Sequence, residues 1–238
     1  MDRLIVALDV PNLEDATRVV DAVAGITRWF KVGSELFTAA GPRAVAMVQE
    51  RGGRVFLDLK FHDIPHTMAA AVNAAGRLGV AMLNVHVAAG EEALRAAVAA
   101  IAETREDGRE HRSLLLGVTR LTSIEDRPEV MAQVVDAAAR AKWCGLDGVV
   151  ASAREAAAIK AACGPEFLVV TPGIRPAGVR PGDQRRIATP AEALRAGADY
   201  LVIGRPVLTA TDPRAAVAAI LEEMDTASHQ EPREPIRK

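Results

Sequence analysis

The residues most able to do chemistry lie in one stretch, residues 58–63, which ends an apolar strand-like run. In a strand, a two-residue spacing puts the side chains of Asp58 and Lys60 on the same face. Asp63 follows the expected end of the strand, so its carboxylate can turn back toward the amine or toward a partner subunit. Lys31 ends a separate strand-like run. If both strands lie in one sheet, two lysines and two aspartates form a cluster of alternating charge.

Such a cluster favours acid chemistry at a lysine. A lysine between two carboxylates stays protonated, because nearby opposite charges favour its charged form. A Schiff-base mechanism needs a neutral amine and is therefore disfavoured. The lysines would repel a divalent cation near Asp58, and no other cluster of His, Asp and Glu has a clear ligand pattern, so we expect no metal. The alternative is a structural ion-pair network, although buried ion pairs rarely stabilise a fold on balance.

A second group of residues is suited to binding an anion. Residues 171–175 open a long loop rich in glycine and proline, and Gly204-Arg205 follows the last strand-like run. Backbone amides and a basic side chain in such loops often bind phosphate. We therefore predict that Arg175 and Arg205 lie near a phosphate group. The alternative is a solvated loop, which suits the other arginines of this segment better.

The bulk composition limits the classes of partner. Over 238 residues, 29 basic residues stand against 31 acidic ones, and the net charge of −2 offers no general attraction for nucleic acid or an anionic membrane. The two cysteines, Cys144 and Cys163, are far apart and suit a reducing compartment. No signal peptide or membrane span is visible. We expect a cytoplasmic protein without nucleic-acid or membrane partners.

Short apolar runs alternate with helix-period stretches along the chain. Strands are expected at 4–10, 29–33, 54–60, 82–87, 114–119, 148–151, 167–171 and 200–204. Helices are expected at 12–24, 34–51, 67–78, 91–104, 127–143, after the capping boxes at 152–155 and 189–192, and from 213 to about 224. Eight such units predict an α/β fold, a parallel (β/α)8 TIM barrel. A doubly wound open sheet is the alternative, weakened by the lack of G-x-G-x-x-G after the first strand.

The predicted barrel occupies residues 1–225 as a single domain, and the polar residues 226–238 are expected to form a disordered C-terminal tail. In barrels of this kind active sites lie at the carboxyl ends of the strands. The residues expected there are Asp9, Lys31, Asp58, Lys60, His86, Thr119, Gly204 and Arg205.

From Leu4 to about Leu208, a series of motifs resembles the orotidine 5′-monophosphate decarboxylase family, whose enzyme completes de novo UMP synthesis. The motifs are Ala7-Leu8-Asp9, Phe30-Lys31-Val32-Gly33, Asp58-Leu59-Lys60-Phe61-His62-Asp63-Ile64-Pro65, Gly117-Val118-Thr119-x-Leu121-Thr122-Ser123, Thr171-Pro172-Gly173-Ile174-Arg175, Gly182-Asp183-Gln184-Arg185-Arg186 and Ile203-Gly204-Arg205-Pro206. The D-x-K-x-x-D core is shared with related sugar-phosphate barrels. Lys31 and the two anion-binding stretches therefore distinguish this family best from those barrels.

The resemblance implies decarboxylation of orotidine 5′-monophosphate to UMP and CO2 without cofactor or metal. It implies that Lys60 protonates ring C6 as CO2 leaves and that Asp58 lies against the substrate carboxylate. Asp9 and Lys31 would contact the ribose hydroxyls. Asp63 would cross, with Thr67, into the neighbouring subunit's site, which implies a homodimer with shared active sites.

The resemblance also assigns the remaining substrate contacts. Thr122 and Ser123 would bind the pyrimidine, Gln184 would bridge the ring and the phosphate, and Gly204 with Arg205 would hold the phosphate. Arg175 is also carried over as a substrate-binding residue. The histidines near the core are expected to support other groups by hydrogen bonding rather than act as the catalyst; they are His62, His66 and His86.

Two other functions are compatible with the same residues. One is a Mg²⁺-dependent sugar-phosphate aldolase or decarboxylase that uses the D-x-K-x-x-D core. The other is a non-catalytic barrel that binds a nucleotide phosphate, with the charge cluster serving only as a salt bridge. The fold alone does not separate these alternatives.

Overall fold

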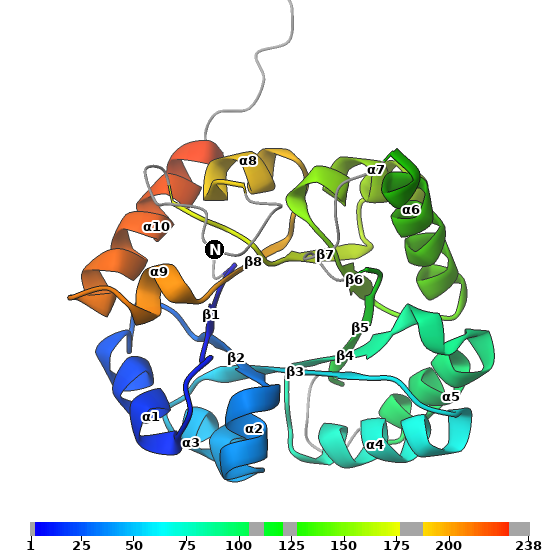
Figure 1. Cartoon of the computed structure of the whole chain (residues 1–238), viewed down its shortest axis with the longest axis horizontal. Helices are drawn as coiled ribbons and strands as arrows, with labels where there is room; N and C mark the ends of the chain where they lie inside the picture. The colour runs from blue at the N-terminus through cyan, green and yellow to red at the C-terminus, as the bar shows by residue number, and fades with distance from the viewer. Residues whose placement is uncertain (1–2, 105–111, 121–127, 177–187, 229–238) are drawn as a thin grey trace, which may run out of the picture.

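The chain forms a closed barrel of parallel strands, each paired with the next in sequence, and β8 pairs with β1. This computed structural model describes residues 3–104, 112–120, 128–176 and 188–228. The strands are β1 (Leu4–Ala7), β2 (Trp29–Gly33), β3 (Arg54–Phe61), β4 (Met82–His86), β5 (Leu114–Val118), β6 (Gly148–Val150), β7 (Leu168–Thr171) and β8 (Tyr200–Ile203). The predicted TIM barrel is confirmed, and the open-sheet alternative is wrong (Figure 1).

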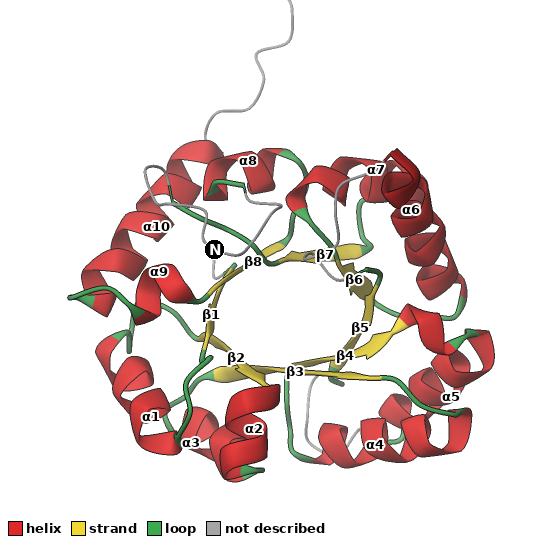
Figure 2. Ribbon diagram, in the orientation of Figure 1, coloured by secondary structure: helices red, strands yellow, loops and turns green. Residues whose placement is uncertain are grey.

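Helices surround the strands on the outside, as Figure 2 shows. They are α1 (Leu13–Ala22), α2 (Ser34–Ala40), α3 (Arg43–Glu50), α4 (Pro65–Arg77), α5 (Glu91–Ala102), α6 (Pro128–Trp143), α7 (Ala153–Cys163), α8 (Pro190–Arg195), α9 (Arg205–Leu208) and α10 (Pro213–Ser228), with a 3-10 turn, η1, at Val87–Ala89. Both predicted capping boxes form: the backbone N–H of Ser152 donates to Glu155, and that of Thr189 donates to Glu192. None of the described helices is long and apolar enough to cross a bilayer.

Apolar side chains fill the barrel interior toward the amino ends of the strands. Residues from successive strands meet there, among them Ile5, Trp29, Phe56 and Met82. The ring of Trp29 packs edge-on against Tyr200 at 5.3 Å between centroids. The interior is therefore a packed core rather than a pore. The polar residues of the same strands gather at the carboxyl ends of the strands.

The structure corrects three details of the predicted helices. The single helix expected over 34–51 is wrong: it is broken into α2 and α3 because Gly41 has φ +59° and Pro42 cannot donate a backbone hydrogen bond. The short helix α9 was not predicted.

The last helix was expected to end near Met224, yet α10 continues to Ser228. Its buried stripe includes Ile220, Met224 and Ala227, which keeps one face of the final turn packed on the core. The tail predicted at 226–238 therefore begins inside this helix, and residues 229–238 lie outside the described part of the chain.

Candidate active site

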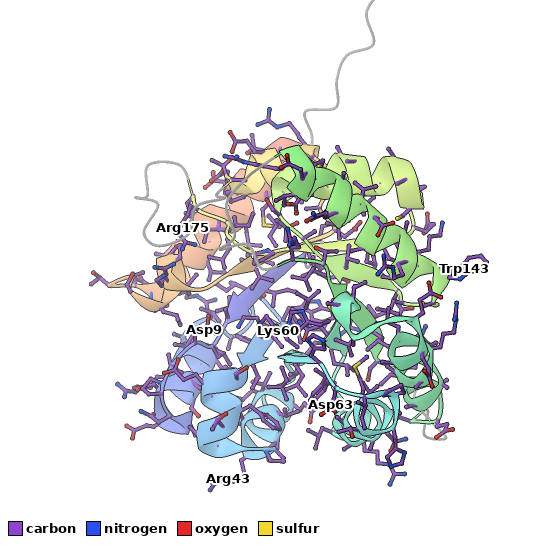
Figure 3. All side chains as sticks on the ribbon, turned by 45° about the vertical axis from the view of Figure 1, so that its right-hand side comes forward. Asp9, Arg43, Lys60, Asp63, Trp143 and Arg175 are labelled. Atoms are coloured by element: carbon purple, nitrogen blue, oxygen red, sulfur yellow. The ribbon has the colours of Figure 1, made fainter. Side chains whose placement is uncertain are left out.

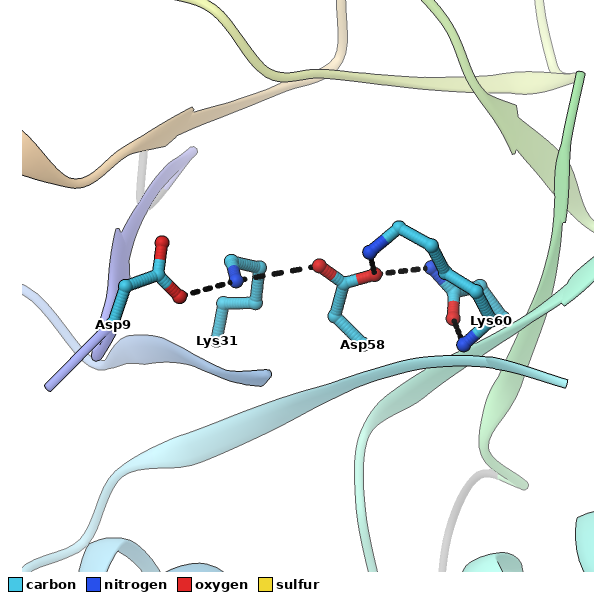
Figure 4. A network of polar contacts seen from close by, with 5 residues as sticks. Asp9, Lys31, Asp58 and Lys60 are labelled. Carbon is cyan, nitrogen blue, oxygen red and sulfur yellow. Dashed lines mark hydrogen bonds and ion pairs between the residues drawn. The ribbon is translucent and has the colours of Figure 1, made fainter. Parts of the chain in front are cut away.

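Four side chains form a continuous row of alternating charge at the carboxyl ends of β1, β2 and β3 (Figure 4). Lys31 Nζ lies 2.8 Å from Asp9 Oδ1 and 3.3 Å from Asp58 Oδ2. Lys60 Nζ lies 2.6 Å from the other oxygen of Asp58. The predicted meeting of two lysines and two aspartates is thus found, but within one chain the second aspartate is Asp9 and not Asp63.

Burial makes the middle of this row strongly dependent on its charged neighbours. Lys31 and Asp58 are each only 8% exposed. Burial alone would raise the pKa of the Asp58 carboxyl, but the ammonium groups of Lys31 and Lys60 hold it below its usual value. Burial alone would lower the pKa of Lys31, but Asp58 and Asp9 raise it above its usual value. Both groups therefore stay charged over a wide range of pH.

The backbone at Lys60 departs from a regular strand. Its φ is +53°, and no other non-glycine residue of the described chain has a positive φ. The pairing of β3 with β4 also shifts between Leu57 and Phe61. Lys60 and Asp58 do share one side of the barrel, but simple strand alternation does not produce this arrangement.

Asn84, which sequence reasoning missed, connects the two residues. Its Nδ2 donates to Asp58 Oδ1 at 2.7 Å, and its Oδ1 accepts from the backbone N–H of Lys60 at 2.8 Å. The side chain is fully buried. The signal in the sequence was an amide inside the otherwise apolar first half of β4, at an interior-facing position two residues after Met82.

A pocket of about 500 Å³ opens above the charged row. Its lining includes Lys31, Asp58 and Lys60 on one side. Gly173, Arg175, Gly204 and Arg205 line it from the segments that follow β7 and β8, so the predicted anion-binding residues lie at the same cavity as the charges. A larger hollow of about 840 Å³ lies where the strands begin, but its acidic residue, Asp147, is paired with Arg112. The chemistry is therefore assigned to the smaller pocket.

Arg175 and Arg205 reach this pocket from different elements. Arg175 is buried, its guanidinium donates to the carbonyl of Ile174 at 2.8 Å, and its backbone N–H donates to the carbonyl of Ala188. Arg205 begins α9 directly after Gly204. A Cβ on Gly204 would lie 3.4 Å from the Cβ of Ala7, so the chain passes close to β1 at this point.

Asp63 and Thr67 are exposed and do not line the pocket of their own chain. Asp63 Oδ1 accepts a hydrogen bond from the N–H of Ile64 at 2.7 Å. In Figure 3, Asp9, Lys60 and Arg175 lie around one end of the barrel, whereas Asp63 lies toward α4. The predicted contacts of Thr122, Ser123 and Gln184 fall outside the described residues.

The remaining polar residues near the strand ends have local partners. The ring centroids of His62 and His86 are 5.3 Å apart, and burial is the main cause that lowers the pKa of His86. His66 is exposed on α4. Thr119 Oγ1 donates to the carbonyl of Val150 at 3.2 Å. Within the described ranges no group of three His, Cys, Asp or Glu side chains could hold a metal ion.

A closed parallel barrel with lysines and carboxylates at the carboxyl ends of its strands defines a TIM-barrel enzyme. Residues 2–220 match the model of the orotidine 5′-phosphate decarboxylase / HUMPS family, so the chain belongs to that family. This confirms the resemblance drawn from the sequence and the prediction that the chain is an enzyme of this kind.

Known relatives match this chain in sequence over nearly its whole length. An orotidine 5′-phosphate decarboxylase of Moorella thermoacetica is 55% identical over 233 residues, covering 94% of this chain and 92% of the relative. One of Trichlorobacter lovleyi is 50% identical, covering 94% and 95%. The crystal structure of orotidine 5′-phosphate decarboxylase from Lactobacillus acidophilus is 35% identical, with a TM-score of 0.82 and coverage of 94% and 100%.

Proposed function

We propose that the protein decarboxylates orotidine 5′-monophosphate to UMP and CO2, the last step of UMP synthesis, and that Lys60 protonates ring C6. The observation that carries this proposal is the row Asp9–Lys31–Asp58–Lys60 in a pocket that also has Arg175 and Arg205 on its wall. The charged row suits a reaction that develops charge on the substrate, and the two arginines suit the binding of a phosphate. The decarboxylases among the relatives support the choice of substrate.

The reaction needs a cation close to the carbon that loses its carboxylate. When the bond from C6 to the carboxylate breaks, CO2 leaves and the electron pair stays on C6. The ammonium of Lys60 stabilises this pair and then transfers a proton to C6, and solvent returns a proton to the lysine. Asp58 holds the ammonium of Lys60 at 2.6 Å and thereby positions it.

The proposal includes no metal and no cofactor. The two ammonium groups next to Asp58 would oppose the binding of a divalent cation at that carboxylate. The cation that the reaction needs is instead supplied by the protein itself.

The phosphate lies at the other side of the pocket, away from the bond that breaks. Arg205 and the backbone near Gly204 would hold it, and Asp9 with Lys31 would contact the ribose hydroxyls. Binding energy from these remote groups increases the rate only where it is realised in the transition state. It would do so by fixing C6 against Lys60.

We also propose that the protein works as a homodimer in which Asp63 and Thr67 complete the partner's site. Both side chains are exposed in the single chain, and Ile64 between them is 66% exposed. An exposed isoleucine beside an exposed carboxylate that does not line the pocket of its own chain suits a surface that a second copy covers. Cytoplasmic location stays a prediction from the sequence.

Mixing two inactive variants tests the shared site. Asp63→Ala and Lys60→Ala chains should each be inactive, but hybrid dimers should regain about a quarter of the wild-type activity if subunits exchange at random. Their subunit exchange is verified by mass spectrometry of differently tagged chains. Exchanged hybrids without activity would contradict the shared site.

The reaction itself is tested by the ultraviolet absorbance of orotidine 5′-monophosphate mixed with the purified protein, with and without EDTA. We expect conversion to UMP that EDTA does not change and that Lys60→Ala abolishes. Loss of conversion with EDTA would favour the Mg²⁺-dependent alternative. Tight UMP binding without any conversion would favour the non-catalytic alternative.

A further inference from the structure

One buried amide, that of Asn84, forms hydrogen bonds with both the backbone and the charge partner of the proposed catalytic lysine. Asn84 comes from β4, the strand next to β3, and it is 0% exposed. Its two hydrogen bonds go to the backbone N–H of Lys60 and to the carboxylate that holds the Lys60 ammonium. Dashed lines in Figure 4 mark these contacts at the labelled residues Asp58 and Lys60. A single side chain thus contacts the backbone of Lys60 and the carboxylate that pairs with the Lys60 ammonium.

The bond to the Lys60 backbone replaces one that a regular sheet would supply. The parallel register of β3 with β4 is broken between Leu57 and Phe61, while the backbone of Asn84 stays in register with Leu116 on the other side. A left-handed φ at a residue with a long side chain persists only where the surroundings enforce it. Here the side-chain Oδ1 of Asn84 accepts a hydrogen bond from the backbone N–H of Lys60, the one non-glycine residue of the described chain with a positive φ.

The chemistry of the site explains why an asparagine is needed. Asp58 can only accept hydrogen bonds when ionised, and a backbone N–H can only donate. A carboxylate at position 84 would accept from Lys60 but would repel Asp58, and an aliphatic side chain would leave both groups without their bond. An amide provides one donor and one acceptor at fixed separation, as the distances of 2.7 and 2.8 Å show.

We propose that Asn84 is a positioning residue for the decarboxylation, one that fixes the left-handed turn at Lys60 and thereby directs its ammonium to Asp58 and to ring C6. This inference rests on the proposed function for its kinetic test. Substrate binding should depend little on Asn84, because Asn84 is buried and does not line the pocket.

Three variants separate positioning from a merely structural role. Asn84→Leu keeps the branching of the side chain at Cγ and removes both bonds, whereas Asn84→Asp keeps only the acceptor. We expect kcat to fall by about 10²-fold in both, with KM and UMP affinity changed by less than about threefold. Ser113→Ala is the matched control, because it removes a buried hydrogen bond to the carbonyl of Val80 at the start of β5. It should lower the melting temperature but keep kcat.

The pH dependence of Asn84→Asp gives a further readout. The introduced carboxyl would face Asp58 and Lys60 on β3, Lys31 on β2 beyond Asp58, and His86 on its own strand. When two carboxyls lie side by side, the repulsion between their negative charges raises the pKa of one of them. Once protonated, the new carboxyl can donate to Asp58 as the amide does. The kcat of this variant relative to wild type should therefore rise as the pH falls.

Amide exchange at Lys60 tests the inference without activity. In the wild type this N–H should exchange slowly, and in folded Asn84→Leu it should exchange at least about tenfold faster. Unchanged exchange, or a folded Asn84→Leu with kcat within about threefold of wild type, would overturn the inference. A wild-type protein that fails to decarboxylate would refute the proposed function instead, and the exchange result would still decide the role of Asn84.

Discussion

Replacing Gly33 by alanine should separate activity from stability, because this glycine leaves space for the charged row. Gly33 ends β2 with φ −94°, a value that alanine adopts without strain. A Cβ at this position would lie 2.9 Å from Lys31 Nζ and 3.3 Å from Asp9 Oδ1. The methyl group would therefore push directly on the contact between Lys31 and Asp9.

The distances set the size of the effect. Ordinary contact begins at 3.4 Å, so the ammonium must move by about half an ångström. Alanine should stabilise the fold by about 0.4–1 kcal/mol through the unfolded chain. The weakened pair with Asp9, whose side chain is 53% exposed, should cost less than about 1 kcal/mol after solvent screening. The melting temperature should thus shift by less than about 4 °C.

Activity should respond far more than stability. Lys31 pairs with Asp58 and is proposed to contact the ribose hydroxyls, so a displacement of this size should lower kcat/KM by about 10- to 100-fold. The assay is the absorbance change of orotidine 5′-monophosphate, with thermal unfolding followed by circular dichroism. Gly25→Ala is the opposite control: φ is +80° and no atom lies within 4 Å of its Cβ, so stability should fall and kcat/KM should stay. A Gly33→Ala enzyme with unchanged kcat/KM would refute the reasoning.

Three further predictions follow from the same contacts. Arg205→Ala should lower kcat/KM by at least about 10²-fold while the melting temperature stays within a few degrees, because the proposed loss is a phosphate contact; kinetics and calorimetry check this. Lys31→Met should lower the free energy of unfolding by about 3 kcal/mol in urea titrations, because Asp58 loses one of its two cations in a buried position. The pKa of His86 is held below its usual 6.5, so the unfolded chain takes up a proton at higher pH than the folded one does. Stability should therefore fall as pH falls below about 6.5, and His86→Gln should reduce that slope in unfolding measurements at several pH values.

The barrel could be predicted from the sequence because each strand is a short apolar run that both the interior and the helices bury. Asp9 follows β1, and Lys31 and Asp58 lie in the second half of β2 and β3, so their meeting near one rim follows from the fold. The capping boxes at Ser152 and Thr189 were predictable for a local reason, since their partners are three residues away.

The features that the sequence did not predict depend on contacts between distant residues or on local breaks in an element. The hydrogen bond between Asn84 and the Lys60 backbone accompanies the shifted register of β3 and β4, which the periodicity of the sequence does not indicate. The left-handed Lys60 follows from the same shift. The division of one expected helix at Gly41-Pro42 was visible in the residue types, but the apolar periodicity on both sides concealed it.

The central claim is that Lys60 exchanges a proton with ring C6, and NMR of UMP in D2O with the protein tests it most directly. By microscopic reversibility, the group that protonates the C6 carbanion must also remove the C6 proton from the product. We predict that the wild type exchanges the C6 proton for deuterium, that EDTA does not alter this, and that Lys60→Ala still binds UMP but does not exchange it. Exchange by Lys60→Ala at the wild-type rate would contradict the account.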